Sequence, residues 1–355
     1  MATRRVDRMG WIEYARAFGA VGVLVIHVLA SVFAVSECEQ QRMAAYSVIS
    51  IVLGRWAVPG FFMITGYLLL NPAKEVGWRQ ARRYSLRMAK VIATFGLVFS
   101  LIKEGWTSYS EGTLSISVLP RAIVDTLTAS SLEHLWYVYA LMLVYLLVPP
   151  LRLLGKKLGP TGFCAFTAVL FVGVLVVPTC IKTWELIQGA DMEIVQVGLV
   201  ALINNTAIGA TCVCVGGCMH YLKLRPWVVL AGIASLATML GISQWGVWNE
   251  YSDMGVVFLQ GSCFACLYAL MVLMLLRDRL GNVAVEQGSI VDELARDSFG
   301  IYVLHPLFLH VFLLFVGPYM LPPVILEALL LVAALVCSVA ATRIVRKLPL
   351  VGGLL

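Results

Sequence analysis

The chain has 355 residues, of which 60% are hydrophobic and only 13% charged, and its formal net charge is +6. Soluble globular proteins are about 45–50% apolar and about 25% charged, so this composition excludes an ordinary soluble protein and indicates a polytopic membrane protein. The basic residues are divided among many short segments and do not form the concentrated basic patch that nucleic-acid binding requires. We therefore expect no nucleic-acid partner.

Ten apolar segments follow one another along the chain, and each is close to the length of about 20 residues that a bilayer-spanning helix needs. We expect these spans at residues 14–35, 46–70, 84–102, 134–151, 161–178, 197–221, 226–246, 254–276, 298–316 and 324–342. No long hydrophilic segment remains between them. The sequence therefore predicts an all-α integral membrane protein, with residues 1–355 forming a single domain of about ten transmembrane helices.

The distribution of basic residues predicts the orientation of this bundle. If the amino terminus is cytoplasmic, 20 of the 26 Lys and Arg residues fall on the inner side and four on the outer side. Lys and Arg are retained in cytoplasmic loops, so we expect both termini in the cytoplasm and membrane lipid around the helices. The first apolar stretch is longer than the core of a cleaved signal peptide, and we expect it to be retained.

The first span carries ionisable residues that lipid disfavours. A charged side chain at the bilayer centre costs roughly 2.5–3.5 kcal/mol and usually marks a water-filled cavity or a functional site. Arg16 and His27 are eleven residues apart, so on a helix they share one face and lie about 16 Å apart along the axis. Glu13 lies near the same stripe. The alternative is that Arg16 reaches a lipid phosphate while His27 hydrogen-bonds a neighbouring helix.

A second intramembrane cation, Arg55, lies about nine residues from the outer end of the second span. By helix rise this is close to the predicted depth of His27. Two placements remain open from the sequence. Either Arg55 lies beside His27, or it forms a structural ion pair with Glu327 in the last span.

A cluster of arginines follows the second span, in the stretch GWRQARRYSLRMAK. If this stretch is helical, Arg79, Arg83 and Arg87 align at intervals of four residues and Arg82 lies one turn from Arg79. Arginine side chains bind phosphate oxygens through two hydrogen bonds at once, which makes them candidates for a phosphorylated ligand. Contact with anionic lipid on the inner side explains the cluster equally well.

Most of the nine cysteines fall within predicted spans, at spacings that do not resemble metal-binding patterns. We expect those in the sixth and eighth spans to be buried as small apolar residues; they are Cys212, Cys214, Cys218, Cys263 and Cys266. The sequence leaves open whether Cys38 and Cys180, both on the predicted outer side, form a disulfide. The longest outer segment, residues 103–133, is expected to hold a short helix that lies on the membrane.

Five stretches, in chain order, resemble the membrane acyltransferase 3 family. They are Arg16 followed by ten residues and His27, VPGFFMITGYLLL, the pair Arg79 and Arg82, HLWYVYALMLVYLLVPPL and SFGIYVLHPLFL. The resemblance covers nearly the whole chain, and the family also has ten spans. Two positions depart from the family pattern, because Glu13 replaces an Asp and Thr65 replaces a Ser. Family members typically transfer an acetyl or other acyl group from cytoplasmic acyl-CoA to a hydroxyl of a glycan or lipid-linked sugar.

The resemblance implies an acetyl-CoA-dependent O-acyltransferase of the bacterial inner membrane that modifies a cell-envelope glycan. It implies that His27 is the general base, since imidazole titrates near neutral pH. Glu13 would order Arg16, and Arg55 is the candidate donor to the developing oxyanion. The donor-binding candidates are Arg79, Arg82, Arg83, Arg87, Tyr302 and His305, and the acceptor-binding candidates are His134, Trp136 and Tyr137.

Simpler explanations of some of these residues stay open. The segment around Tyr302 and His305 also suits a packing helix kinked at Pro306, and His134 with its aromatic neighbours also suits an interfacial anchor. A transporter or flippase of a lipid-linked sugar is the alternative function, because intramembrane ionisable residues suit it. The sequence lacks the matched pair of broken half-helices typical of such transporters. An accessory subunit without catalysis is a third alternative, which the Arg16 and His27 pair argues against.

Overall fold

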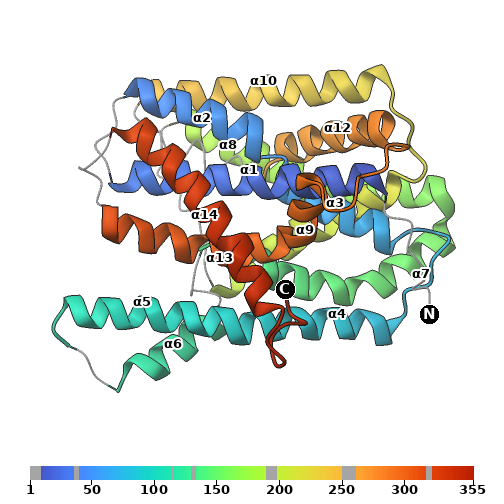
Figure 1. Ribbon diagram of the computed structural model, residues 1–355. Coiled ribbons are helices and arrows are strands. Elements are labelled where there is room, and N and C mark those ends of the chain that lie inside the picture. Colours follow the sequence, from blue (N-terminus) through green and yellow to red (C-terminus); the bar gives the residue numbers. More distant parts are fainter. Residues whose placement is uncertain are drawn as a thin grey trace.

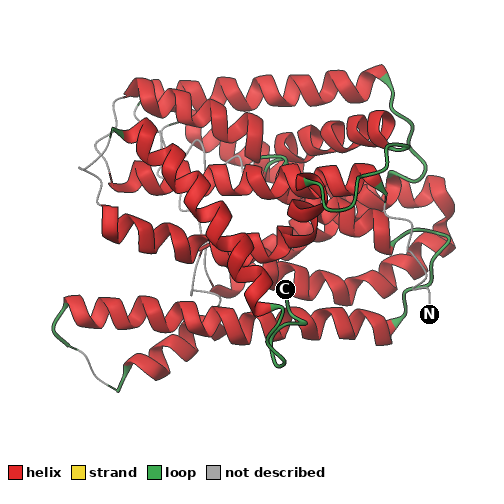
Figure 2. Cartoon of the chain, in the orientation of Figure 1, coloured by secondary structure: helices red, strands yellow, loops and turns green. Residues whose placement is uncertain are grey.

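The computed structural model describes residues 9–35, 40–113, 116–128, 133–188, 198–249, 261–316 and 322–355. Within these ranges the regular elements are helices, and most of the long ones run roughly parallel to one another (Figure 1). Figure 2 shows helices joined at their ends by loops, with no strand in the described part of the chain. The predicted all-α class is confirmed.

The helices are α1 (Gly10–Val35), α2 (Gln40–Gly54), α3 (Ala57–Leu69), α4 (Trp78–Val91), α5 (Leu97–Ser110), α6 (Val118–Leu127), α7 (Trp136–Phe171), α8 (Val177–Ile187), α9 (Gly198–Cys218), α10 (Pro226–Trp248), α12 (Cys263–Leu280), α13 (Ile290–Val316) and α14 (Pro323–Val345). Two π-helical segments, Ile92–Gly96 and Val172–Val176, connect α4 to α5 and α7 to α8. A short 3₁₀ segment, Glu133–Leu135, precedes α7. The helices therefore occupy most of each described range.

Eight helical stretches in the described ranges are long and apolar enough to cross a membrane, whereas the sequence predicts about ten spans. One of the eight, Trp136–Glu185, has 50 residues and contains two predicted spans. Gly159 within it has φ 66° and ψ 179°, a backbone conformation that glycine tolerates and a helix does not. This kink divides the stretch into two helices, and each of the two predicted spans corresponds to one of them.

The remaining difference concerns α12, which corresponds to the predicted span 254–276. That span begins outside the described residues, and the inner end of α12 carries Arg277, Asp278 and Arg279. Because of these charges, α12 is not among the eight stretches that are apolar enough to cross a membrane. It nevertheless packs against α1, α3 and α10 within the bundle. The ten predicted segments therefore each have a helical counterpart in the described part of the chain.

The predicted third span, 84–102, is part of a longer stretch, Trp78–Ser110, that reads as one helix through the π-helical segment. The arginine cluster predicted after the second span is therefore helical, because it lies on α4. The short helix expected in the outer segment is α6. It lies along α5 (Figure 1) and contacts it through the hydroxyls of Ser100 and Thr126, which are 3.0 Å apart.

The outside of the bundle is apolar. Val169 on α7, Leu230 on α10 and Val332 on α14 are 71%, 66% and 61% exposed. A water-soluble protein rarely leaves so many large apolar side chains exposed, whereas lipid accommodates helices that are apolar all round. The protein is therefore a multi-pass membrane protein. The five cysteines of the predicted sixth and eighth spans are buried, as expected, while Cys38 lies outside the described residues.

Segments that the sequence places on the same side of the membrane contact one another. Arg152 donates hydrogen bonds to the carbonyl oxygens of Leu69 (2.6 Å) and Asn71 (3.1 Å), all on the predicted inner side. On the predicted outer side, the Gln244 amide donates to the carbonyl oxygen of Ala44 (2.9 Å). These contacts support the predicted alternation of helix direction. The assignment of the first side to the cytoplasm stays a prediction.

Candidate functional site

Helix α1 carries the site, and it lies at the centre of the bundle. It packs against α2, α3, α12, α13 and α14. Gly22 makes this close packing possible, since a Cβ atom there would lie 2.3 Å from the carbonyl oxygen of Leu53 at the end of α2. Arg55 stands in the break between α2 and α3, just beyond this contact. The close approach therefore holds Arg55 near α1, where its charge acts on His27.

Three histidines from distant parts of the chain form one cluster. His27 comes from α1, His134 from the 3₁₀ segment before α7, and His305 from α13. The centroid of the His305 ring lies 4.8 Å from that of His27 and 5.7 Å from that of His134, and the other two are 6.4 Å apart. His305 is completely buried, His134 is 5% exposed and His27 is half-buried. We call these three residues the histidine cluster.

Two buried tyrosines line the histidine cluster. The ring centroid of Tyr302 lies 6.3 Å from His305 and 5.4 Å from Tyr137. The Tyr302 hydroxyl also donates a hydrogen bond to the carbonyl oxygen of His134, which ties α13 to the start of α7. Trp136, the neighbouring candidate, is half-buried with its ring 6.4 Å from Tyr137. The structure thus brings together residues that the sequence assigns separately to base, donor and acceptor.

Hydrogen bonds within the helices determine which ring nitrogens are free. His27 Nδ1 lies 2.8 Å from the Val23 carbonyl oxygen, and His305 Nδ1 lies 2.9 Å from that of Ile301. A carbonyl oxygen only accepts, so in both rings Nδ1 carries the hydrogen and donates it. The neutral imidazoles then present Nε2 as an acceptor. Nε2 of His305 and Nε2 of His134 have no hydrogen-bond partner among the described residues.

Arg16 lies on the same side of α1 as His27. It is half-buried, and its charge acts on the hydroxyls of Tyr137 and Tyr145, both on α7. Tyr137 in turn contacts Tyr302 beside the histidine cluster. Because α1 is uninterrupted from Gly10 to Val35, Arg16 and His27 remain about 16 Å apart along its axis. Glu13, which is 7% exposed, lies one turn before Arg16.

The structure distinguishes between the two placements of Arg55. Glu327 pairs with Arg42, whose guanidinium nitrogen lies 3.6 Å from its carboxylate. Arg55 is 8% exposed, and its charge acts on His27. Its Nε atom has no hydrogen-bond partner among the described residues. The ion pair between Arg42 and Glu327, and the effect of the Arg55 charge on His27, therefore favour a placement of Arg55 near His27 over a structural pair with Glu327.

The arginines of α4 form a separate basic surface. This helix buries Ala81, Ser85, Met88 and Val91 and packs against α7, while Arg79, Arg82 and Arg83 are exposed. The sequence predicted that these arginines align if the stretch is helical, and α4 is helical over this stretch. None of them has a described contact with the histidine cluster.

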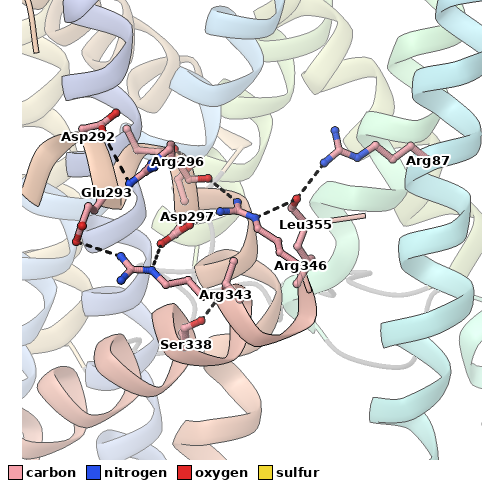
Figure 3. A network of polar contacts seen from close by, with 12 residues as sticks. Arg87, Asp292, Glu293, Arg296, Asp297, Ser338, Arg343, Arg346 and Leu355 are labelled. Atoms are coloured by element: carbon pink, nitrogen blue, oxygen red, sulfur yellow. Dashed lines mark hydrogen bonds and ion pairs between the residues drawn. The ribbon is translucent and has the colours of Figure 1, made fainter. Parts of the chain in front are cut away.

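Arg87 differs from the other arginines of α4 because its guanidinium hydrogen-bonds to the main chain of the protein. Its guanidinium donates to the main-chain oxygens of Leu354 (3.1 and 3.2 Å) and Leu355 (3.4 Å). Arg346 donates to Leu355 and also pairs with Asp297 on α13. Figure 3 shows Arg87 and Arg346 approaching Leu355 from opposite sides. Of the predicted donor-binding arginines, Arg79, Arg82 and Arg83 thus have the more open side chains.

A pocket of about 410 Å³ opens between the end of α3 and the start of α4. Leu68 and Val76 give it an apolar wall, and Lys74, Gln80 and Tyr84 give it polar groups. The Tyr84 ring lies 5.3 Å from that of Tyr145, which the charge of Arg16 reaches. Sequence reasoning missed Gln80 and Tyr84. Gln80 and Tyr84 are four residues apart in the arginine-rich stretch, and this spacing indicates that they share one face of a helix.

The comparisons with known proteins identify a family for most of the chain. Residues 9–343 match the model of a family described as an acyltransferase domain, Acyl_transf_3. No curated protein and no solved structure matched the chain. The matched range includes the histidine cluster, Arg16, Arg55 and the arginines of α4.

Proposed function

Since the chain belongs to the acyltransferase 3 family and is therefore an acyltransferase, we propose that it transfers an acyl group, by default acetyl, from acyl-CoA to a hydroxyl of a cell-envelope glycan or lipid-linked sugar. His27 is the general base. One observation carries this role. His27 is the half-buried imidazole of the histidine cluster, and its Nδ1 is held by the Val23 carbonyl, which leaves Nε2 to accept a proton.

The proposed reaction needs one base and one donor to the oxyanion. Nε2 of His27 accepts the proton of the acceptor hydroxyl while the hydroxyl oxygen bonds to the thioester carbonyl carbon. The carbon–sulfur bond then breaks, and the proton on His27 passes to the departing thiolate of CoA. The Arg55 guanidinium is buried, lies within electrostatic range of His27 and has an Nε without a described partner. It is therefore suited to stabilise the developing oxyanion.

The acyl-CoA donor is proposed to bind from the inner side. The exposed side chains of Arg79, Arg82 and Arg83 suit the phosphates of CoA, because guanidinium groups bind phosphate oxygens bidentately. The pocket lined by Gln80 and Tyr84 lies on the same helix. The Tyr84 ring contacts that of Tyr145, and the Tyr137 ring contacts that of Tyr302. The charge of Arg16 acts on both Tyr145 and Tyr137, which supports a path for the pantetheine arm along α1.

The acceptor is proposed to meet the histidine cluster at the start of α7, where Trp136 and Tyr137 supply aromatic rings. Aromatic faces suit the apolar faces of a sugar. The resemblance to the acyltransferase 3 family, whose members typically modify glycans or lipid-linked sugars, supports a polysaccharide or its lipid-linked precursor as the acceptor, and the bacterial inner membrane as the location. The acceptor, the location and the identity of the acyl group are all parts of the proposal.

The His27→Ala substitution tests the function. Membrane vesicles carrying the protein are incubated with [acetyl-¹⁴C]acetyl-CoA, and label is measured in their glycolipid and polysaccharide fractions. Loss of general-base catalysis costs about 10²- to 10⁴-fold in rate, so the variant should transfer almost no label. His310→Ala is the matched control. Nδ1 of His310 likewise lies 2.7 Å from the carbonyl oxygen four residues earlier, that of Pro306. Unlike His27, however, His310 is exposed.

Two results contradict the proposal in different ways. If wild-type vesicles transfer no label above vesicles without the protein, the acyl-CoA-dependent reaction is wrong. If the His27→Ala variant is inserted normally and transfers label at the wild-type rate, the reaction stands and His27 is not its base.

A further inference from the structure

The two most closely placed imidazoles of the histidine cluster are arranged alike. The His27 ring on α1 and the His305 ring on α13 lie edge to face, with ring centroids 4.8 Å apart and planes inclined by 64°. Each Nδ1 donates to the carbonyl four residues earlier on its own helix. In each ring the distal nitrogen, Nε2, is therefore the one left to accept a hydrogen.

Burial assigns different roles to these two rings. His27 is half-buried, so its Nε2 can meet a substrate hydroxyl. His305 is 0% exposed, and its Nε2 has no hydrogen-bond partner among the described residues. Buried polar atoms are nearly always hydrogen-bonded, and leaving one without a partner costs about 1–3 kcal/mol. The arrangement of His305 thus provides an acceptor for a hydrogen that arrives during the reaction.

The surroundings of His27 explain the need for this acceptor. When His27 takes a proton it becomes an imidazolium in a half-buried site, and a charge that is withdrawn from water without a hydrogen-bond partner is expensive. The charged group within electrostatic range is Arg55, which repels a second cation. In Ser-His-Asp enzymes a carboxylate stabilises the imidazolium. No described contact joins a carboxylate to His27, whereas a second imidazole lies beside it.

We propose that His305 is a positioning residue for the transfer reaction, and that its Nε2 accepts a hydrogen bond from Nε2–H of His27 after His27 has taken the proton of the acceptor hydroxyl. The proton is shared between the two rings while the carbon–oxygen bond forms and the carbon–sulfur bond breaks. It then leaves with the CoA thiolate as the thiol, so both imidazoles end neutral. This inference rests on the proposed function and replaces the donor-lining role that the sequence suggested for His305.

The test uses His305→Gln, because glutamine keeps a hydrogen-bonding side chain but cannot share a proton as a base. In vesicles with [acetyl-¹⁴C]acetyl-CoA, we expect the saturating rate to fall at least about tenfold, as for lost acid–base assistance. The KM for acetyl-CoA should stay within a factor of two of the wild-type value. His310→Gln, on the same helix and with the same type of contact to its own carbonyl, should keep the wild-type rate.

A chemical rescue separates proton sharing from packing. The His305→Ala variant should regain rate when imidazole is added and should not respond to pyrazole, which has the same size but is a much weaker base. If Gln lowers the amount of folded protein, His305→Asn is measured in its place.

Each outcome decides one of the two proposals. A wild-type saturating rate in His305→Gln, a change confined to the KM for acetyl-CoA, or equal rescue by pyrazole would overturn the role of His305 and leave the proposed function intact. Absence of transfer by the wild-type protein would instead overturn the proposed function, and the role of His305 with it.

Discussion

At the level of single residues, the candidate site gathers three buried side chains with incomplete hydrogen bonding, while Ser243, Glu327 and Ser338 each carry such an atom elsewhere in the described part of the chain. Nε of Arg55 and Nε2 of His134 and of His305 lack partners among the described residues, and all three side chains are less than 9% exposed. Such groups are costly in a membrane interior, so a sequence retains them where a ligand or a reaction completes their hydrogen bonds. By contrast, Arg42 has a carboxylate partner in Glu327.

The contrast between Arg55 and Arg42 gives a residue-level prediction. Arg55→Gln should lower the saturating transfer rate about 10²- to 10³-fold, the usual effect of removing a donor to an oxyanion, with little change in the KM for acetyl-CoA. Arg42→Gln removes a cation that is paired with Glu327 and should lower the rate less than threefold. Steady-state rates in vesicles measure both. Equal losses in the two variants would show that Arg55 acts on the fold and not on the oxyanion.

At the level of elements, the site depends on how closely α1 approaches the break between α2 and α3. Gly22 on α1 and Gly54 at the end of α2 face each other, and a Cβ atom on Gly54 would lie 2.7 Å from the carbonyl oxygen of Gly22. Because backbone atoms form this contact, they cannot move aside as a flexible side chain can. The helix break and the close contact together place Arg55 against α1.

Gly22→Ala tests this packing. The added Cβ would lie 2.3 Å from the Leu53 carbonyl oxygen, so the helices must separate, and overpacking of this kind costs about 1–3 kcal/mol. We expect a lower Tm in detergent and a reduced transfer rate. The control is Gly105→Ala on α5, where nothing lies within 4 Å of the new atom. There alanine should leave the Tm unchanged or raise it, as its helix propensity exceeds that of glycine by about 1 kcal/mol. A Gly22→Ala variant with a Tm no lower than that of the Gly105→Ala control would refute the close approach.

At the level of the whole molecule, the bundle separates a basic surface, on the predicted inner side, from a buried polar centre. The arginines of α4 are exposed, the histidine cluster is largely enclosed, and Arg16 lies between them on α1. The main chain of Leu354 and Leu355 ties α4 to α14 through Arg87 and Arg346 (Figure 3). A donor that carries phosphates at one end and a thioester at the other suits this arrangement.

The proposed direction of donor entry depends on the membrane orientation, which can be measured. A fluorescent protein fused before Met1 should fold and fluoresce, because that end is predicted to be cytoplasmic. Alkaline phosphatase fused after Glu111, between α5 and α6, should be active because that segment is predicted to lie outside. The opposite pattern would place the arginines of α4 on the outer side and remove access to cytoplasmic acyl-CoA.

Features that depend on local periodicity could be predicted from the amino-acid sequence. Apolar length and composition predicted helices in a membrane, and helix geometry placed Arg16 and His27 on one face; both are local properties, and α1 is indeed uninterrupted. Sequence boundaries were less accurate where helices continue past the membrane, as α4 does, because lipid ends an apolar pattern without ending a helix. The family itself was recognisable because its five motifs keep their order along the chain.

Which distant residues meet depends on how the helices pack, and local patterns in the sequence do not predict that packing. Nothing in the local pattern around His134 or His305 indicates contact with His27, because helix periodicity fixes the face a residue occupies and not the helix that covers that face. For the same reason the sequence left Arg55 between His27 and Glu327, and it could not indicate that Arg87 binds the main chain of Leu354 and Leu355. Packing between helices settled these partners, since side-chain shape, close glycine contacts and the break after α2 are satisfied together in one arrangement.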